Sequence, residues 1–128
     1  MRIENSYMKP NIIADKSKAF ALKTIQLHNY LVNEKKEYVM SRQILKSGTS
    51  IGANIRESKN AQSSLDFINK LSIALKEADE TAYWLELLTE SKTIEQNISS
   101  SLFSELNEII SLLTSIIKTT KNNINKKN

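Results

Sequence analysis

The densest group of side chains that could do chemistry is a set of carboxylates between residues 77 and 90. Its members are Glu77, Asp79, Glu80, Glu86 and Glu90. Helical bundles can hold di-metal centres, but those centres need Glu-x-x-His pairs on two helices. Here the residue three positions after Glu77 is Glu80, and the only histidine, His28, lies far away in the sequence. The pattern therefore predicts no metal ligand, and a charged outer face or a subunit contact remains as its interpretation.

Nucleophilic catalysis is not predicted either. His28 has no carboxylate or nucleophile at helical spacing, so the partners that a Ser-His-Asp arrangement requires are missing. The chain contains no cysteine, which excludes disulfides and thiolate metal sites and is compatible with a reducing setting. We therefore expect no catalytic residue, no cofactor and no small-molecule substrate. The protein is not predicted to be an enzyme.

Both glycines of the chain, Gly48 and Gly52, lie inside the otherwise helical segment 41–57. A glycine in a helix interior costs about 1 kcal/mol relative to alanine. A phosphate-binding loop would need a Gly-Lys-Ser/Thr ending and a preceding strand, and neither is present. Residues four apart share one helix face, and a face without side chains lets another helix approach closely. We therefore predict close helix packing and assign both glycines to an oligomer interface.

The basic residues are the only candidates for contacts with nucleic acid. They occur at helical spacing in pairs, namely Lys16 with Lys23, Arg42 with Lys46, and Arg56 with Lys59. Such spacing makes a stripe that can follow phosphates. No base-reading motif accompanies them, so we expect binding of RNA or DNA without sequence preference. Solvated helix faces are the alternative interpretation.

Charge is also divided unevenly along the chain. Residues 1–62 carry eleven Lys and Arg against five acids, residues 63–117 carry three against nine, and the last eleven residues add four lysines. The net charge of the chain is +4. A basic and an acidic half indicate either a side that faces a polyanion or head-to-tail complementarity between subunits.

Apolar residues repeat at helical spacing in four segments, which predict helices from about 15 to 33, 41 to 60, 63 to 90 and 93 to 120. The third segment has the most regular pattern, a heptad seam of Phe67, Leu71, Ala74, Ala78, Thr81, Leu85 and Leu88. Ser41, Ser63 with Asp66, and a capping box of Thr93 with Gln96 are the predicted helix starts. Links of four to eight residues favour antiparallel neighbours. We predict an all-α, antiparallel up-down-up-down four-helix bundle as one domain over residues 1–128, with a frayed basic tail at about 121–128.

Tyr83 and Trp84 follow one another in this third segment, whose seam uses Thr81 and Leu85. Two adjacent aromatic side chains cannot both point into the same core. We therefore expect at least one of them to leave the bundle axis. Contact with another subunit, burial under a neighbouring helix of the same chain, and base stacking are the interpretations, and we assign both residues to the oligomer interface.

No apolar segment is long enough to cross a bilayer. The best candidate, residues 109–117, has nine residues and includes Ser111, Thr114 and Ser115. The amino terminus has Arg2 but no apolar block after it, so no secretory signal is predicted. We expect a cytoplasmic protein without a membrane partner.

These segments resemble a known family, the four-helix-bundle proteins encoded in the intervening sequences of bacterial 23S ribosomal RNA genes. Three blocks carry the resemblance. The first is Ser41–Glu57, around LKSGTSIGANIRES at residues 45–58. The others are DFINKLSIALKEADETAYWLELL at Asp66–Leu88 and LTSIIK at Leu113–Lys118. The resemblance implies an up-down bundle that assembles as a homopentamer with a central channel. The chain is also similar to the accessory proteins of diversity-generating retroelements, which share that shape and work with a reverse transcriptase and nucleic acid.

Three functions follow as hypotheses. The first is a non-catalytic oligomeric bundle that acts as a nucleic-acid-binding or scaffolding accessory. The second is a protein-protein interaction module with no nucleic-acid binding. The third, an enzyme, lacks candidate residues in this sequence.

Overall fold

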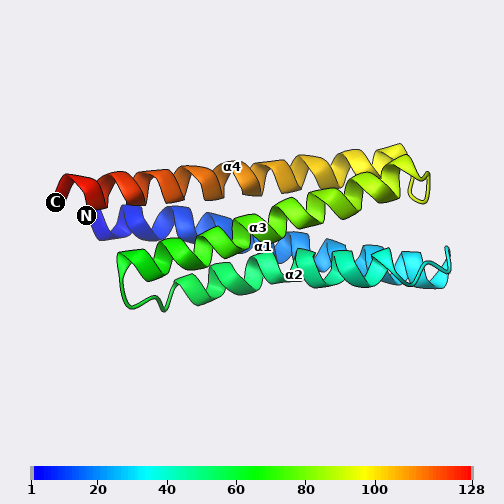
Figure 1. Ribbon diagram of the computed structural model, residues 1–128, viewed down its shortest axis with the longest axis horizontal. Helices are drawn as coiled ribbons and strands as arrows, with labels where there is room; N and C mark the ends of the chain where they lie inside the picture. The colour runs from blue at the N-terminus through cyan, green and yellow to red at the C-terminus, as the bar shows by residue number, and fades with distance from the viewer. Residues whose placement is uncertain (1, 128) are drawn as a thin grey trace.

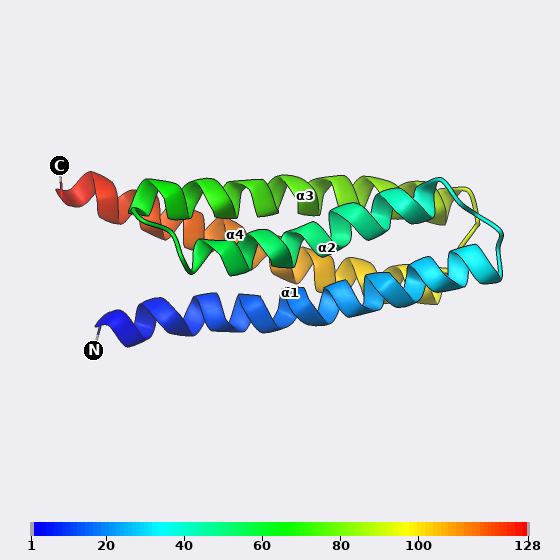
Figure 2. The ribbon, with the colours of Figure 1, turned by 90° about the horizontal axis from the view of Figure 1, so that it is seen from below.

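Four long helices make up the computed structural model, which describes the backbone of residues 2–127 and the side chains of residues 12–126. They are α1 (Arg2–Asn33), α2 (Met40–Ser58), α3 (Ser64–Glu90) and α4 (Gln96–Lys127). Each helix packs antiparallel to the next, and α4 closes the ring against α1. Figure 1 and Figure 2 show α1 and α3 at opposite corners of the bundle, with both chain termini at one end. The predicted all-α up-down-up-down bundle is confirmed.

The heptad seam of α3 forms the centre of the core. Six of its seven predicted positions are buried, and Phe67 at its start is partly buried, while Ile68 beside it is buried. The predicted stripe of α4, from Leu102 to Ile116, is buried in full. Apolar side chains at a helical period of 3.5–3.6 residues share one face, which is why the sequence located the core correctly.

Small hydroxyl side chains lie between the helices at the centre of the bundle. The buried Thr81 hydroxyl of α3 can donate to Oγ of Ser47 on α2, at 2.8 Å, or to the Glu77 carbonyl, at 2.8 Å. On the other side of α3, the hydroxyls of Thr89 and Ser99 hydrogen-bond at 2.7 Å. These pairs satisfy buried polar groups and let the helices approach closely, because their side chains are short.

Two of the three predicted helix starts are wrong. Helix α2 begins at Met40 after Val39, which provides no side-chain cap. The carboxylate of Glu37 accepts instead from the backbone N–H groups of Val39, Met40 and Ser41, at 3.2, 3.0 and 2.7 Å. A charged acceptor with two oxygens satisfies several of these N–H groups, which one Ser41 hydroxyl could not do.

The Ser41 hydroxyl therefore caps no N–H group. It is buried, and no described residue is its hydrogen-bond partner. The predicted capping box is also absent, because α4 begins at Gln96 and the Thr93 hydroxyl bonds to Ser91 at 2.8 Å. The third predicted start is confirmed, since Ser63 Oγ accepts from the Asp66 N–H at 3.0 Å.

The first and last helices, α1 and α4, are longer than predicted. Helix α1 begins at Arg2 rather than near Asp15, and it continues through Pro10, a residue that usually ends a helix because it has no N–H to donate. Helix α4 continues to Lys127 rather than ending at Thr120. The partly buried Ile124 packs against the core, and this contact supports the extra turns where a frayed tail was predicted.

Candidate nucleic-acid interface

The two predicted basic residues of α1 lie at the contact with α4. Nζ of Lys16 is 2.7 Å from Oε1 of Glu108, and Lys23 forms an ion pair with Glu105. Such exposed pairs contribute about 1 kcal/mol or less to stability. Each pair places a carboxylate directly beside the lysine, so the local charge offered to a phosphate is close to neutral. Structure thus separates Lys16 and Lys23 from the other four candidates.

The other four candidates, three on α2 and one at its C-cap, are all exposed, and no described residue forms an ion pair with any of them. They are Arg42, Lys46, Arg56 and Lys59, and we call them the α2 edge. At 1.5 Å per residue they extend over about 25 Å of helix. This is the length of several nucleotides of an extended single strand. The α2 edge is therefore a line of available positive charge along one side of the bundle.

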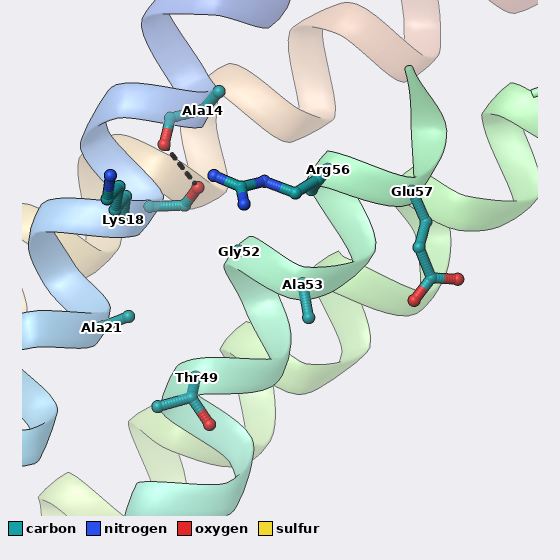
Figure 3. Close-up of a pocket in the computed structure, with 9 residues that line it drawn as sticks. Ala14, Lys18, Ala21, Thr49, Gly52, Ala53, Arg56 and Glu57 are labelled. Atoms are coloured by element: carbon teal, nitrogen blue, oxygen red, sulfur yellow. Dashed lines mark hydrogen bonds between the residues drawn. The ribbon is translucent and has the colours of Figure 1, made fainter. Parts of the chain in front are cut away.

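A groove between α1 and α2 lies next to this edge. Its floor is made of small residues and its rim of two cations: Ala14, Ala21, Gly52, Ala53, Lys18 and Arg56. Figure 3 shows the Arg56 side chain extending from α2 toward α1, while Glu57, which also lines the groove, is directed away from α1. Glu57 binds Nζ of Lys70 at 3.0 Å, and this hydrogen bond raises the pKa of Lys70 above its usual value of 10.5.

Lys18 is the rim residue that sequence reasoning missed. A signal for it was present, because Lys18, Leu22 and Ile25 recur at spacings of four and three, outside the core stripe of α1. Ile25 is 41% exposed, and Leu22 is 54% exposed. The two aliphatic side chains continue the groove side of α1 beyond Lys18.

The two glycines occupy different environments. Gly48 is buried where α2 crosses α1, and a Cβ at this position would lie 2.7 Å from Cγ2 of Thr24. The predicted close helix packing is therefore present, but between helices of one chain. Thr24 covers Gly48, which leaves no room there for a second subunit. Gly52 is half-buried on the groove floor, with Ser17 at ordinary contact distance, and an interface role for it remains a prediction.

The adjacent aromatic residues separate as expected. Tyr83 is 53% exposed, whereas Trp84 is partly buried against the core and its Nε1 donates to Oε2 of Glu80 at 3.4 Å. Their rings meet edge to face with centroids 5.3 Å apart. The expectation that at least one of them leaves the bundle axis is confirmed. Their assignment to an oligomer interface remains a prediction.

A second hollow lies between α3 and α4, with Leu75 and Ile117 on its floor and Lys118 and Lys121 on its rim. The sequence suggested only a charged tail here. Continuation of α4 past Thr120 places Lys121 on an ordered helix face, one turn from Lys118.

Among residues 12–126, no three His, Cys, Asp or Glu side chains come together in a way that could hold a metal ion. His28 is partly exposed, and its Nδ1 lies 3.5 Å from Oδ1 of Asn29. The helices of the described region include none that is both long and apolar enough to span a membrane.

Comparisons with known proteins agree with this bundle. The family model of the 23S rRNA-intervening sequence protein matches residues 9–115. A crystal structure of a protein with unknown function, from the S23 ribosomal protein family of Bacteroides thetaiotaomicron, is 58% identical. It superposes with a TM-score of 0.85 and covers 86% of this chain and 98% of its own. No curated protein matches. The chain belongs to the 23S rRNA-intervening sequence protein family.

Proposed function

We propose that this protein is a non-catalytic accessory that holds RNA or DNA through phosphate contacts along the α2 edge. The observation that carries the proposal is the difference between the two sets of basic residues. Lys16 and Lys23 have carboxylates within ion-pair distance, and the four residues of the α2 edge have none among the described residues. Cations that remain unpaired on an exposed helix are available to a polyanion.

The chemistry of the edge favours binding without sequence preference. Helix α2 contains no aromatic residue on which a base could stack. Phosphate contacts position a nucleic acid but do not read its sequence. Affinity should therefore come from counterion release and fall steeply as salt increases.

Self-association is part of the proposal. One α2 edge has only four cations, and a homo-oligomer would repeat it on every subunit. Repeated sites on one nucleic acid raise the apparent affinity through their effective concentration. The family resemblance implies a homopentamer, so we expect a ring of five copies that displays five edges.

Fluorescence anisotropy with a labelled single-stranded RNA tests the proposal. The double variant Arg42→Gln/Lys46→Gln should weaken binding about tenfold or more, because two phosphate contacts are lost, and should lower the slope of log K against log salt by about 1–2 per subunit. Lys16→Gln/Lys23→Gln is the matched control, since it removes the same charge from paired positions and should change affinity much less. Equal losses in both variants would mean that binding follows net charge, and no binding by the wild type would reject the proposal.

A second candidate function is a protein-protein interaction module that binds no nucleic acid. Two adjacent apolar side chains at the turn between α1 and α2 favour it, since Tyr38 is 53% exposed and Val39 is 69% exposed. Exposed apolar residues next to one another can anchor a partner. Retention of one specific protein on the immobilised bundle after nuclease treatment, combined with a flat salt response to RNA, would support this candidate.

A further inference from the structure

We infer that the groove between α1 and α2 is the acceptor for the outer ridge of α3 from a second copy of this chain. The inference rests on the proposed self-association and names the two surfaces that would meet, one on each subunit, in a head-to-tail contact. The ridge consists of Asp79, Tyr83, Glu86 and Glu90. These residues recur at spacings of four, three and four, so they share one face of α3, and all four are exposed.

The shape of the groove selects a bulky occupant. Its volume is about 470 Å³, and it is open to solvent along one side. A single ion would leave most of this space unfilled. Small side chains at Ala14, Ala21, Gly52 and Ala53 let a helix come close, which is the geometry that a row of side chains on a partner helix needs.

Charge complementarity identifies the partner as the α3 ridge. Lys18 stands on the α1 wall and Arg56 on the α2 wall of the groove. On the ridge, carboxylates flank Tyr83 one turn away on each side, at Asp79 and Glu86. None of these four charged groups forms an ion pair with a described residue. Docking would place an aromatic side chain on the small floor and bring each wall cation close to a carboxylate.

Apolar contact would extend beyond the groove. Leu22 and Ile25 continue the α1 wall and are 54% and 41% exposed. Tyr83 on the ridge is 53% exposed. Burial of these three side chains removes apolar surface from water, which is the main source of favourable free energy in association, and aromatic residues are frequent anchors of interfaces.

The positions of the two surfaces exclude contact within one subunit. The groove opens along α1, and α3 lies at the opposite corner of the bundle (Figure 1 and Figure 2). The acceptor and the ridge are therefore different patches on opposite sides of the molecule. Such a head-to-tail contact closes into a ring if the rotation between subunits permits it, and otherwise forms a filament.

Assembly also divides the basic residues between two tasks. Figure 3 shows the Arg56 side chain directed across the groove, so a docked ridge would withdraw it from the α2 edge. Arg42, Lys46 and Lys59 would remain exposed for the polyanion. Variants at Arg42 and Lys46 therefore test nucleic-acid binding, and variants on the groove floor test assembly.

Two blocking variants and their mixture test the inference. Gly52→Leu fills the groove floor, where a Cβ meets Ser17 only at 3.4 Å, so the monomer should still fold. Tyr83→Lys replaces the exposed aromatic side chain of the ridge with a cation, which would face Lys18 and Arg56 of the second copy and be repelled by them. Light scattering on the wild type should give an oligomer, and each variant alone should give monomers with unchanged far-UV circular dichroism. An equimolar mixture should give a one-to-one heterodimer, because each variant supplies the surface that the other lacks.

Several results would overturn the inference: a monomeric wild type, a blocking variant with wild-type mass, or a mixture that stays monomeric or grows beyond a dimer. A folding failure in Gly52→Leu would show as lost circular dichroism, and Lys18→Gln/Arg56→Gln then tests the acceptor in its place. Arg42→Gln/Lys46→Gln should keep the wild-type mass whether or not it loses RNA affinity. Failure of assembly and failure of polyanion binding are thus distinguishable.

Discussion

Gly48 and Gly52 should respond in opposite directions to substitution by alanine. Neither glycine has a positive φ angle, so backbone conformation does not favour glycine at either position. The removal of glycine from a helix interior should stabilise each by about 1 kcal/mol. What differs is the space for a Cβ atom. At Gly52 the nearest atom is Ser17 Oγ at 3.4 Å, which is ordinary contact.

At Gly48 the added atom would lie 2.7 Å from Cγ2, 2.8 Å from Oγ1 and 3.2 Å from Cβ of Thr24. Thr24 cannot easily turn away, because a β-branched side chain in a helix is restricted at χ1 and its hydroxyl donates to the Phe20 carbonyl at 2.9 Å. Overpacking of this kind costs about 1–3 kcal/mol. After the propensity gain, we expect Gly48→Ala to lower the free energy of unfolding by about 1 kcal/mol, and Gly52→Ala to raise it by up to about 1 kcal/mol.

Urea unfolding followed by Trp84 fluorescence and far-UV circular dichroism measures both changes, at one protein concentration because assembly would add to stability. Thr24→Ala provides the internal control, since it removes two of the three crowding atoms. In that background Gly48→Ala should become neutral or stabilising, a coupling of about 1–2 kcal/mol. A Gly48→Ala protein as stable as Gly52→Ala, or no coupling to Thr24, would refute the close-packing argument.

Three further substitutions test individual interactions by the same unfolding assay. Thr81→Val should destabilise the protein by about 1–3 kcal/mol, because buried Ser47 loses its hydrogen-bond partner. The double variant Thr81→Val/Ser47→Ala should recover most of that loss. Equal stability of the single and double variants would contradict the role of the pair. Ser41→Ala should stabilise by about 1 kcal/mol by removing a buried hydroxyl without a described partner, and a loss of stability would show that the hydroxyl is satisfied. Lys92 has φ 62°, a left-handed conformation that glycine adopts more easily, so Lys92→Gly should be neutral or stabilise the protein by up to about 1 kcal/mol. The control Lys76→Gly, inside α3, should destabilise it by about 1 kcal/mol. Similar losses in both variants would exclude strain at Lys92.

The helical core could be predicted from the sequence because its information is local. Positions such as Leu71, Ala78 and Leu85 lie on one face of α3 in any helix with this sequence, and one apolar face per helix is enough to specify a bundle. For the same reason the sequence predicted that at least one of Tyr83 and Trp84 leaves the bundle axis, but it did not predict which one. Two adjacent side chains cannot both point into the core beside Thr81 and Leu85.

The fate of each charged residue could not be predicted, because it depends on how the helices face one another. Lys16 and Lys23 looked equivalent to Arg42 and Lys46 in sequence, yet only the first two face carboxylates of α4. Ser41 had the right residue type for a cap, but Glu37 competes for the same N–H groups and has a charged acceptor. Both errors arise from contacts with residues that periodicity does not relate.

Uneven charge along the chain acquires a physical meaning once the bundle is formed. The α1–α4 contact neutralises part of the basic half, and Glu57 pairs with Lys70 across α2 and α3. What remains is a cationic side on α1 and α2 and an anionic, aromatic ridge on α3. Two copies can bring the cationic side of one and the acidic ridge of the other together, whereas one copy cannot. Assembly would therefore cover the acidic ridge together with Lys18 and Arg56, and a ring would leave Arg42, Lys46 and Lys59 exposed on every subunit. On this argument, Tyr83→Lys should lower RNA affinity although Tyr83 is far from the α2 edge, because a monomer has one edge and exposes the acidic ridge. If monomeric Tyr83→Lys bound RNA with the same affinity as the wild type, RNA binding would not depend on assembly, and this argument would be wrong.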